Sequence, residues 1–152
     1  MKKSFLISVW VILLFVSACS SNTAQPTIDP TQGVQMLAGT YSTVITESDV
    51  TNFKSLEENF ANNKGTWEIV FAQDGKFTAT RDGQYLADGL FIVKGSEVEI
   101  DVRNVCENCP CNGAIGRYFW SLNDKQLGFS KKAGVCDAMD LALTAHGLTR
   151  QP

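Results

Sequence analysis

The chain has 152 residues, of which 44% are hydrophobic, and it carries 13 Lys and Arg against 16 Asp and Glu. This acidic balance argues against nucleic acid or an anionic membrane face as a partner, because both attract clustered positive charge. Once the N-terminal segments are set aside, the remaining length fits one ordinary domain, so we expect no second domain.

The first 18 residues have the three parts of a secretory signal. Lys2 and Lys3 precede a predominantly apolar run over 5–16, and small residues follow it. The run is about a dozen residues long, whereas a membrane-spanning helix needs about 20. We therefore predict that 1–18 is a cleaved signal peptide.

The tetrapeptide Val16-Ser17-Ala18-Cys19 resembles the bacterial lipobox. The resemblance implies that Cys19 is acylated, with palmitate-type chains, and becomes the first mature residue. It would then anchor the protein in a cell membrane or an outer membrane, facing the extracytoplasmic side. Two or three acyl chains anchor stably, since each buried methylene contributes ~0.8 kcal/mol. An ordinary signal with a chance cysteine, or an uncleaved anchor, is the alternative.

Loss of Lys2 and Lys3 with the signal would leave 11 basic residues against 16 acidic ones, a formal charge of −5. Residues 20–35 follow, with two prolines, little hydrophobic content and no usable period. That composition is typical of a flexible tether. We therefore expect a lipidated N-terminus and tether at 19–35, and a folded domain at 36–152.

The rest of the chain is patterned mainly at the period of a β-strand. Apolar residues alternate clearly within 67–71, 98–102 and 118–122. Turn signals between the segments are short enough for antiparallel hairpins. The expected strands are 37–46, 66–72, 76–81, 89–94, 96–103, 117–122 and 125–130.

Two segments break this pattern. Residues 48–62 carry four apolar residues at helical spacing after a Ser or Asp that can serve as an N-cap, and 137–143 predict a short helical turn. A meander with a helix after its first strand predicts an all-β fold. We expect a small antiparallel up-and-down barrel of about eight strands, which leaves no exposed edges.

Short glycine–aromatic motifs, in their order along the chain, resemble those of bacterial lipocalin-like proteins and, more loosely, calycin barrels. The resemblance implies that an aromatic residue near the first strand is packed by a basic residue near the C-terminus. Here that pairing is Tyr41 or Trp67 with Arg150, and the choice stays open because the opening glycine is followed by Tyr rather than Trp. The motifs cover nearly all of the chain after Met36, and they are 38–41, 65–67, 74–77, 89–93, 116–120 and 148–150.

An eight-stranded barrel is just wide enough to be filled by its own side chains or to hold one small ligand. The lipocalin-like resemblance implies a carrier of a small hydrophobic molecule, with 48–62 as a lid. The alternative is a filled barrel that serves as a structural or protein-interaction module of the cell envelope, with 48–62 as a plug. Both hypotheses use the same inward residues, which are Trp67, Ile69, Phe71, Phe77, Phe91, Val93, Ile100, Val102, Tyr118, Trp120 and Phe129.

Four cysteines remain once Cys19 is lipidated, and an oxidising compartment would close them into disulfides. Because Cys109 and Cys111 are too close in sequence to pair easily, the residues alone leave two pairings open. Cys106 pairs with Cys109 and Cys111 with Cys136, or Cys106 pairs with Cys111 and Cys109 with Cys136. The lipocalin-like resemblance implies Cys111–Cys136, and we predict that pairing together with Cys106–Cys109.

Zinc binding and redox exchange are the alternatives for these cysteines. The spacing lacks the two separated Cys-x-x-Cys knuckles of a zinc site, and Cys106-x-x-Cys109 follows a strand instead of beginning a helix. We therefore predict neither a metal nor any other cofactor.

The sequence does not predict an enzyme. His146 is the only histidine, and no nucleophile and orienting carboxylate accompany it in a recognisable order. The acidic pairs, such as Asp137 with Asp140, are interpreted as solvated faces, and Arg103 and Arg117 as outward residues because they are out of phase with the inward set. We expect a monomer that contacts the membrane through the lipid on Cys19, with no nucleic acid and no identified protein partner.

Overall fold

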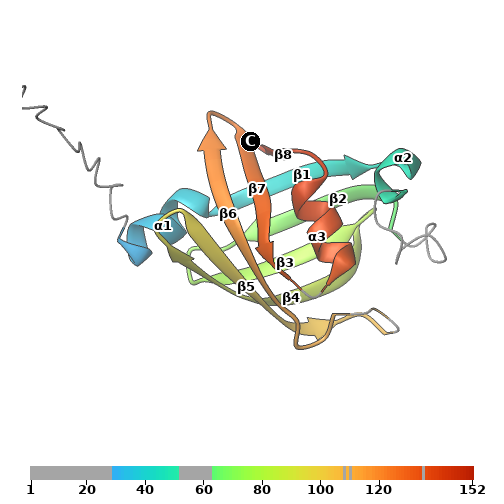
Figure 1. The fold of residues 1–152 in the computed structure, drawn as a ribbon, viewed down its shortest axis with the longest axis horizontal. Helices are drawn as coiled ribbons and strands as arrows, with labels where there is room; N and C mark the ends of the chain where they lie inside the picture. The colour runs from blue at the N-terminus through green and yellow to red at the C-terminus, as the bar shows by residue number, and fades with distance from the viewer. Residues whose placement is uncertain (1–28, 52–62, 108, 110, 135) are drawn as a thin grey trace, which may run out of the picture.

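The computed structural model describes residues 29–51, 63–107, 109, 111–134 and 136–152. It is a closed barrel in which eight antiparallel strands pair in chain order (Figure 1). The strands are β1 (Gly39–Ile45), β2 (Gly65–Phe71), β3 (Lys76–Arg81), β4 (Gln84–Lys94), β5 (Glu97–Val105), β6 (Ile115–Asn123), β7 (Gln126–Ala133) and β8 (Leu148–Arg150). The helices are α1 (Pro30–Leu37), α2 (Glu47–Val50) and α3 (Asp137–Thr144). The expected barrel is confirmed, with a short helix after its first strand and another near the C-terminus.

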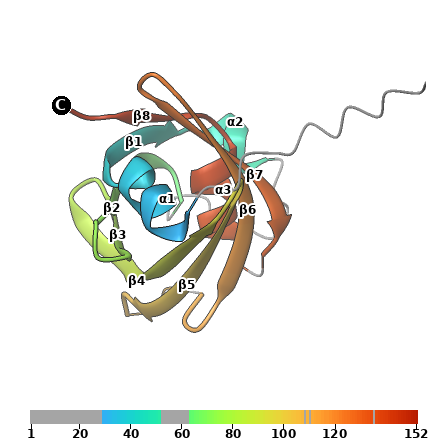
Figure 2. The same cartoon turned by 90° about the vertical axis from the view of Figure 1, so that its left-hand side faces the viewer.

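The two ends of the barrel carry different connections. α1 leads into β1 at one end, and because Gly39 pairs with Phe71, the β2–β3 hairpin closes at that same end. The β4–β5 and β6–β7 hairpins close there too, whereas α2, the cysteine-bearing β5–β6 connection and α3 belong to the opposite end (Figure 1). Figure 2 shows α1 lying in the mouth of the barrel with the strands around it.

α1 corrects the end of the predicted tether at 19–35. The chain is already helical from Pro30, six residues before the predicted start of the folded domain. Asp29 caps the helix by accepting a hydrogen bond from Thr31 N at 2.8 Å, and Pro30 occupies a first-turn position where no amide donor is needed. Gly33 and Leu37 are buried, and the helix packs against β4. A two-turn helix needs apolar residues on one face only. The few apolar residues of this segment therefore gave no helical signal in the sequence.

Three β-bulges interrupt the ladders, and they explain where alternation fails. In the β3–β4 bulge, the consecutive residues Leu86 and Ala87 are both buried, which breaks the alternation that predicts a strand. The structure has β4 beginning at Gln84, and not at 89 as the sequence predicts. In the β6–β7 bulge Lys132 is the extra residue; Lys131 before it contacts the buried Asp140, and Lys132 contacts Glu97 on the outside. The third bulge lies between β4 and β5, at Arg103.

Among the described residues, no helix has the length and apolar character needed to cross a membrane. The expected signal peptide, Cys19 and most of the segment 48–62 lie outside the described residues.

Candidate functional site

The inward side chains of the barrel pack against one another. Ten of the eleven residues expected inside are at most 8% exposed, and Trp120 is partly buried with its Nε1 donating to Gly95 O at 3.1 Å. Five aromatic rings form a connected series with centroids 5.1–6.1 Å apart, within the range of favourable ring pairs. The series runs Tyr41–Phe71–Phe129–Tyr118, with Phe91 also on Phe71. These rings therefore pack against one another inside the barrel.

α3 adds to this core at the end opposite α1. Its residues Leu141, Ala142 and Leu143 are fully buried, and the helix packs beside β7 (Figure 1). A helix whose apolar residues extend around its circumference is one that other elements surround. The expected short helical turn is thus a two-turn helix whose apolar residues belong to the hydrophobic core.

A buried carboxylate fixes α3 to the barrel wall. Asp140 is completely buried, and its Oδ1 accepts a 2.6 Å hydrogen bond from the Tyr118 hydroxyl of β6. Lys131 Nζ of β7 lies 2.5 Å from Oδ2, a contact that is an ion pair without the alignment of a hydrogen bond. Burial, and then the hydrogen bond to Asp140, hold the pKa of Tyr118 well above its usual value, so Tyr118 stays a donor.

Two glycines make room for this network. A Cβ on Gly116 would lie 2.5 Å from the Tyr118 hydroxyl oxygen, and a Cβ on Gly134 would lie 2.6 Å from Asp140 Oδ1. Real Cβ atoms do not approach that closely, so both positions must lack a side chain. The sequence interpretation of Asp140 as part of a solvated face is therefore wrong. The signal that could have corrected it is Lys131, which continues the inward phase of Leu127 and Phe129.

The opposite end of the core is closed by Arg150. Its guanidinium carbon lies 5.5 Å from the centre of the Tyr41 ring, and its Nη2 donates to Ala38 O. Of the two aromatic partners implied by the resemblance, the structure selects Tyr41. Trp67 instead donates from Nε1 to Asn63 O at 2.9 Å. The Tyr41 hydroxyl is buried and has no hydrogen-bond partner among the described residues.

The cysteines form the two predicted disulfides, Cys106–Cys109 and Cys111–Cys136. The longer link joins the β5–β6 connection to the residue that caps α3, where Cys136 Sγ accepts from Met139 N at 3.4 Å. It therefore clamps the helix that carries Asp140. Within the described part of the chain, His, Cys, Asp and Glu side chains form no group of three or more that could hold a metal ion.

His146 has a partner that the sequence did not reveal. Its Nε2 lies 3.0 Å from Asp49 Oδ1, and Asp49 Oδ2 accepts hydrogen bonds from the backbone and side chain of Thr46 at 2.8 and 2.7 Å. Burial acts to raise the pKa of Asp49, but the hydrogen bonds from Thr46 and His146 outweigh it, and the pKa is lowered. This contact joins α2 to the loop after α3 and closes the same end of the barrel.

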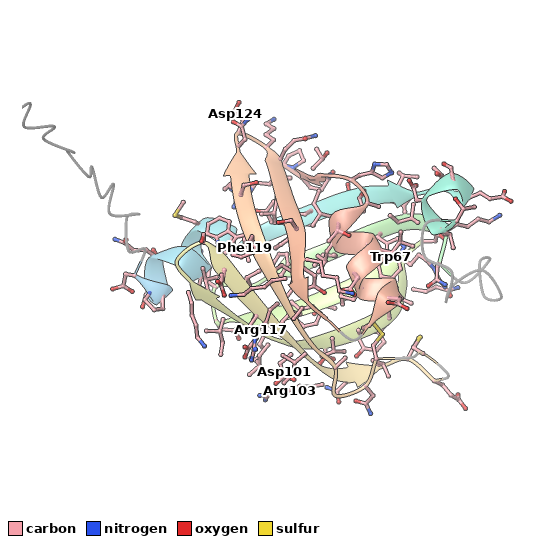
Figure 3. All side chains as sticks on the ribbon, viewed as in Figure 1. Trp67, Asp101, Arg103, Arg117, Phe119 and Asp124 are labelled. Carbon is pink, nitrogen blue, oxygen red and sulfur yellow. A yellow bond between two sulfur atoms is a disulfide. The ribbon has the colours of Figure 1, made fainter. Side chains whose placement is uncertain are left out.

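A shallow hollow of about 560 Å³ lies on the outside, where the β6–β7 turn meets Gly147. Its side chains are polar and include Asp124, which projects at the tip of the hairpin (Figure 3). It is separate from the inward residues predicted to contact a ligand.

Comparison of the chain with protein-family models, with curated proteins and with solved structures found no match.

Proposed function

We propose that this protein is a lipid-tethered module of the cell envelope that meets its partners through the outer surface of a filled barrel. The observation that supports the proposal is the packing of the ring series against itself, with the apolar residues of α3 buried in the same core. A guest of the size that calycin-like barrels hold would have to displace these groups.

Displacement of the core groups would be costly. Returning one fully buried aromatic or aliphatic side chain to water costs roughly 1.5–3 kcal/mol, and a guest would need to expel several. Movement of α3 would also separate Asp140 from Lys131 and Tyr118, which are its charged and hydrogen-bonding partners. The strength of these contacts favours a permanent core over a gated cavity.

Export and lipidation belong to the same proposal. The sequence of 1–19 supports them, and so do the two disulfides, because such bonds persist in oxidising compartments outside the cytoplasm. α1 begins at Pro30, eleven residues after Cys19, so the tether would join the barrel at its α1 end.

A carrier of a small hydrophobic molecule is the second candidate, and one observation favours it. A buried hydroxyl without a partner usually signals a water or another group that completes it. The Tyr41 hydroxyl is such an atom, so a guest with a polar group beside Tyr41 would satisfy it. The lipocalin-like resemblance supports this candidate as well.

A cavity-creating variant separates the two candidates. The oxidised full chain in detergent is titrated with benzene-sized and fatty-acid-like probes, with Trp67 and Trp120 as fluorescent reporters, alongside Phe71→Ala and Phe119→Ala. A filled barrel takes up no probe, but Phe71→Ala opens an apolar cavity that binds the small probe, since dry cavities of about 150 Å³ do so. Phe119→Ala is the control, because that ring is on the outside.

Saturable binding of a fatty-acid-like probe by the unmodified chain, abolished by a bulky Ala79→Phe substitution, would instead establish the carrier. If Phe71→Ala does not fold, Phe129→Ala gives the same comparison at the next ring of the series.

A further inference from the structure

The outer face of β4–β6 gathers most of the exposed apolar residues that the structure describes. Six large hydrophobic side chains are exposed in that part of the chain, and four of them, Tyr85, Ile92, Ile115 and Phe119, lie on these three strands at 43–47% exposure. Single exposed apolar residues are ordinary on a protein surface, but their concentration on one face marks an interaction site. Tyr, Phe and Arg are also the types enriched at protein interfaces.

The same face carries three ion pairs. Lys132 lies 2.5 Å from Glu97, Arg117 2.8 Å from Glu99, and Arg103 3.0 Å from Asp101. Asp101, Arg103 and Arg117 lie together outside the barrel in Figure 3, as expected for outward residues. Their cationic side chains are 42–57% exposed. Exposed pairs of this kind contribute little to stability, at most about 1 kcal/mol each.

Backbone irregularities help to build this arrangement. Arg103 is the extra residue of the β4–β5 bulge and Lys132 that of the β6–β7 bulge. Bulges re-aim side chains at the cost of ladder hydrogen bonds, and they are common beside functional surfaces. Here they bring two cations onto a face that carries three acidic residues of β5, Glu97, Glu99 and Asp101. Each of these carboxylates has one basic partner, which is Arg103 on β5 itself, Arg117 on β6 and Lys132 on β7.

We infer that this face pairs with the same face of a second copy of the chain. Glu99 of β5 is directly opposite Arg117 of β6 in the ladder. A twofold axis running along the strands between β5 and β6 would place β5 of one copy over β6 of the other. Glu99 would then face Arg117 of the second copy, and Arg117 would face Glu99 of the second copy. A self-complementary patch of this kind is what a twofold interface requires.

Two of the apolar residues lie beside the central row. Phe119 pairs with Glu97 and Ile115 with Asp101, so in the ladder these two side chains lie on either side of the central Glu99–Arg117 row. Lys132 Nζ lies 5.4 Å from the centre of the Phe119 ring and covers part of it. Pairing about this axis would place Phe119 over Glu97 and Ile115 over Asp101 of the second copy, on either side of the central pair of reciprocal ion contacts.

The position of the tether agrees with this axis. A twofold rotation about an axis along the strands keeps the α1 ends of both copies at the same end of the pair. Two chains that are anchored in one membrane, as the proposed function has it, could therefore pair without lifting either anchor. This part of the inference rests on the proposed function, whereas the face and its charges do not. Pairing would also replace the sequence expectation of a monomer.

Charge reversal tests the pairing directly. The full chain is purified in detergent, and its mass is measured by sedimentation equilibrium over a range of protein concentrations; energy transfer between labelled chains in vesicles repeats the test. We expect a dimer, and we expect Glu99→Arg and Arg117→Glu, each alone, to weaken it about tenfold or more, because like charges then meet. An equal mixture of the two variants should restore the mass of a dimer, since the arginine introduced in one variant then meets the glutamate introduced in the other.

Val44→Asp is the matched control, because Val44 is the most exposed of the six apolar residues, at 57%, and lies on β1 away from this face. Phe119→Asp provides a second disruption at the apolar part of the face. Urea unfolding of each variant verifies that the barrel is intact.

A monomer at every concentration, in detergent and in vesicles, would overturn the inference. So would a dimer that the single reversals leave unchanged, or one that the mixture does not restore. None of these outcomes bears on the filled interior, which the probe titration tests separately.

Discussion

Two tyrosines close the aromatic series, and their surroundings differ at the two ends of the barrel. At the α1 end, the Tyr41 ring lies under Arg150, and its hydroxyl is buried without a partner among the described residues. At the α3 end, the Tyr118 hydroxyl donates to Asp140, which Lys131 neutralises. The α1 end is thus held through an aromatic face, and the α3 end through a buried polar network and a disulfide.

The difference teaches where each end is vulnerable. Contacts through apolar surface weaken gradually when one group is trimmed, whereas a buried charge becomes costly as soon as one partner is removed. We therefore expect substitutions at the α3 end to lower the free energy of unfolding strongly, and substitutions at the α1 end to change it little.

The largest effect is expected from the disulfide that clamps α3. Replacement of Cys111 and Cys136 by Ser should lower the free energy of unfolding by about 3 kcal/mol, because the bridge spans 25 residues of the chain. Replacement of Cys106 and Cys109, which are separated by three residues, should cost about 2 kcal/mol or less on the same entropic ground. Urea unfolding of the two double variants measures both, and an equal or reversed order would contradict the assignment of the clamp.

The next effect distinguishes two adjacent lysines. Lys131→Met should destabilise the fold by about 2–3 kcal/mol, because it leaves the Asp140 carboxylate buried without its counter-charge. Lys132→Met removes an ion pair whose two side chains are 42% and 37% exposed, so it should cost about 0.5 kcal/mol or less. Urea midpoints for the pair of variants give the comparison. Similar losses at both positions would mean that Asp140 does not depend on Lys131.

The two tyrosines themselves give a matched test. Tyr118→Phe deletes a hydrogen bond to a charged group and should cost about 2 kcal/mol. Tyr41→Phe deletes a hydroxyl that has no partner among the described residues, so it should leave stability unchanged or raise it slightly. Thermal and urea unfolding measure both. A substantial loss in Tyr41→Phe would show that the hydroxyl is satisfied in solution, by a water or a guest, and would favour the carrier hypothesis.

The smallest effect is a pH dependence at Asp49. The pKa of Asp49 is lowered in the folded chain, so its contribution to stability is present above its usual value near 3.8 and is lost as the pH falls below that value. Asp49→Asn should therefore flatten the decline of the urea midpoint between pH 5 and pH 3, relative to the unmodified chain. Asp124→Asn, in an exposed turn, is the control. An identical decline in Asp49→Asn would remove Asp49 from the acid response.

The sequence predicts the barrel well because alternation and turn chemistry are local signals. The strands near 67–71, 98–102 and 118–122 were expected on their periodicity, and all three lie within strands of the structure. The sequence did not predict elements whose local pattern is interrupted or weak. Leu86 and Ala87 are consecutive buried residues at a bulge, and α1 shows only one apolar face.

The buried network could not be derived from the sequence for a different reason. The burial of Asp140 depends on Tyr118 and Lys131 of two other elements, and on glycines at 116 and 134 that leave room for the two side chains. An acidic residue in a short helix resembles a solvated one until those partners are placed. The disulfides were predicted correctly only with the help of the lipocalin-like resemblance, since the residues alone left two pairings open.

Native mass spectrometry of the full chain, purified in mild detergent from the envelope of cells that express it, tests the filled interior most directly. A filled barrel predicts the mass of the chain with its covalent acyl groups alone, or twice that mass, and no further adduct when the detergent is removed in the gas phase. A retained small apolar molecule of defined mass, lost when Ala79→Phe is introduced, would contradict the filled barrel and establish a carrier.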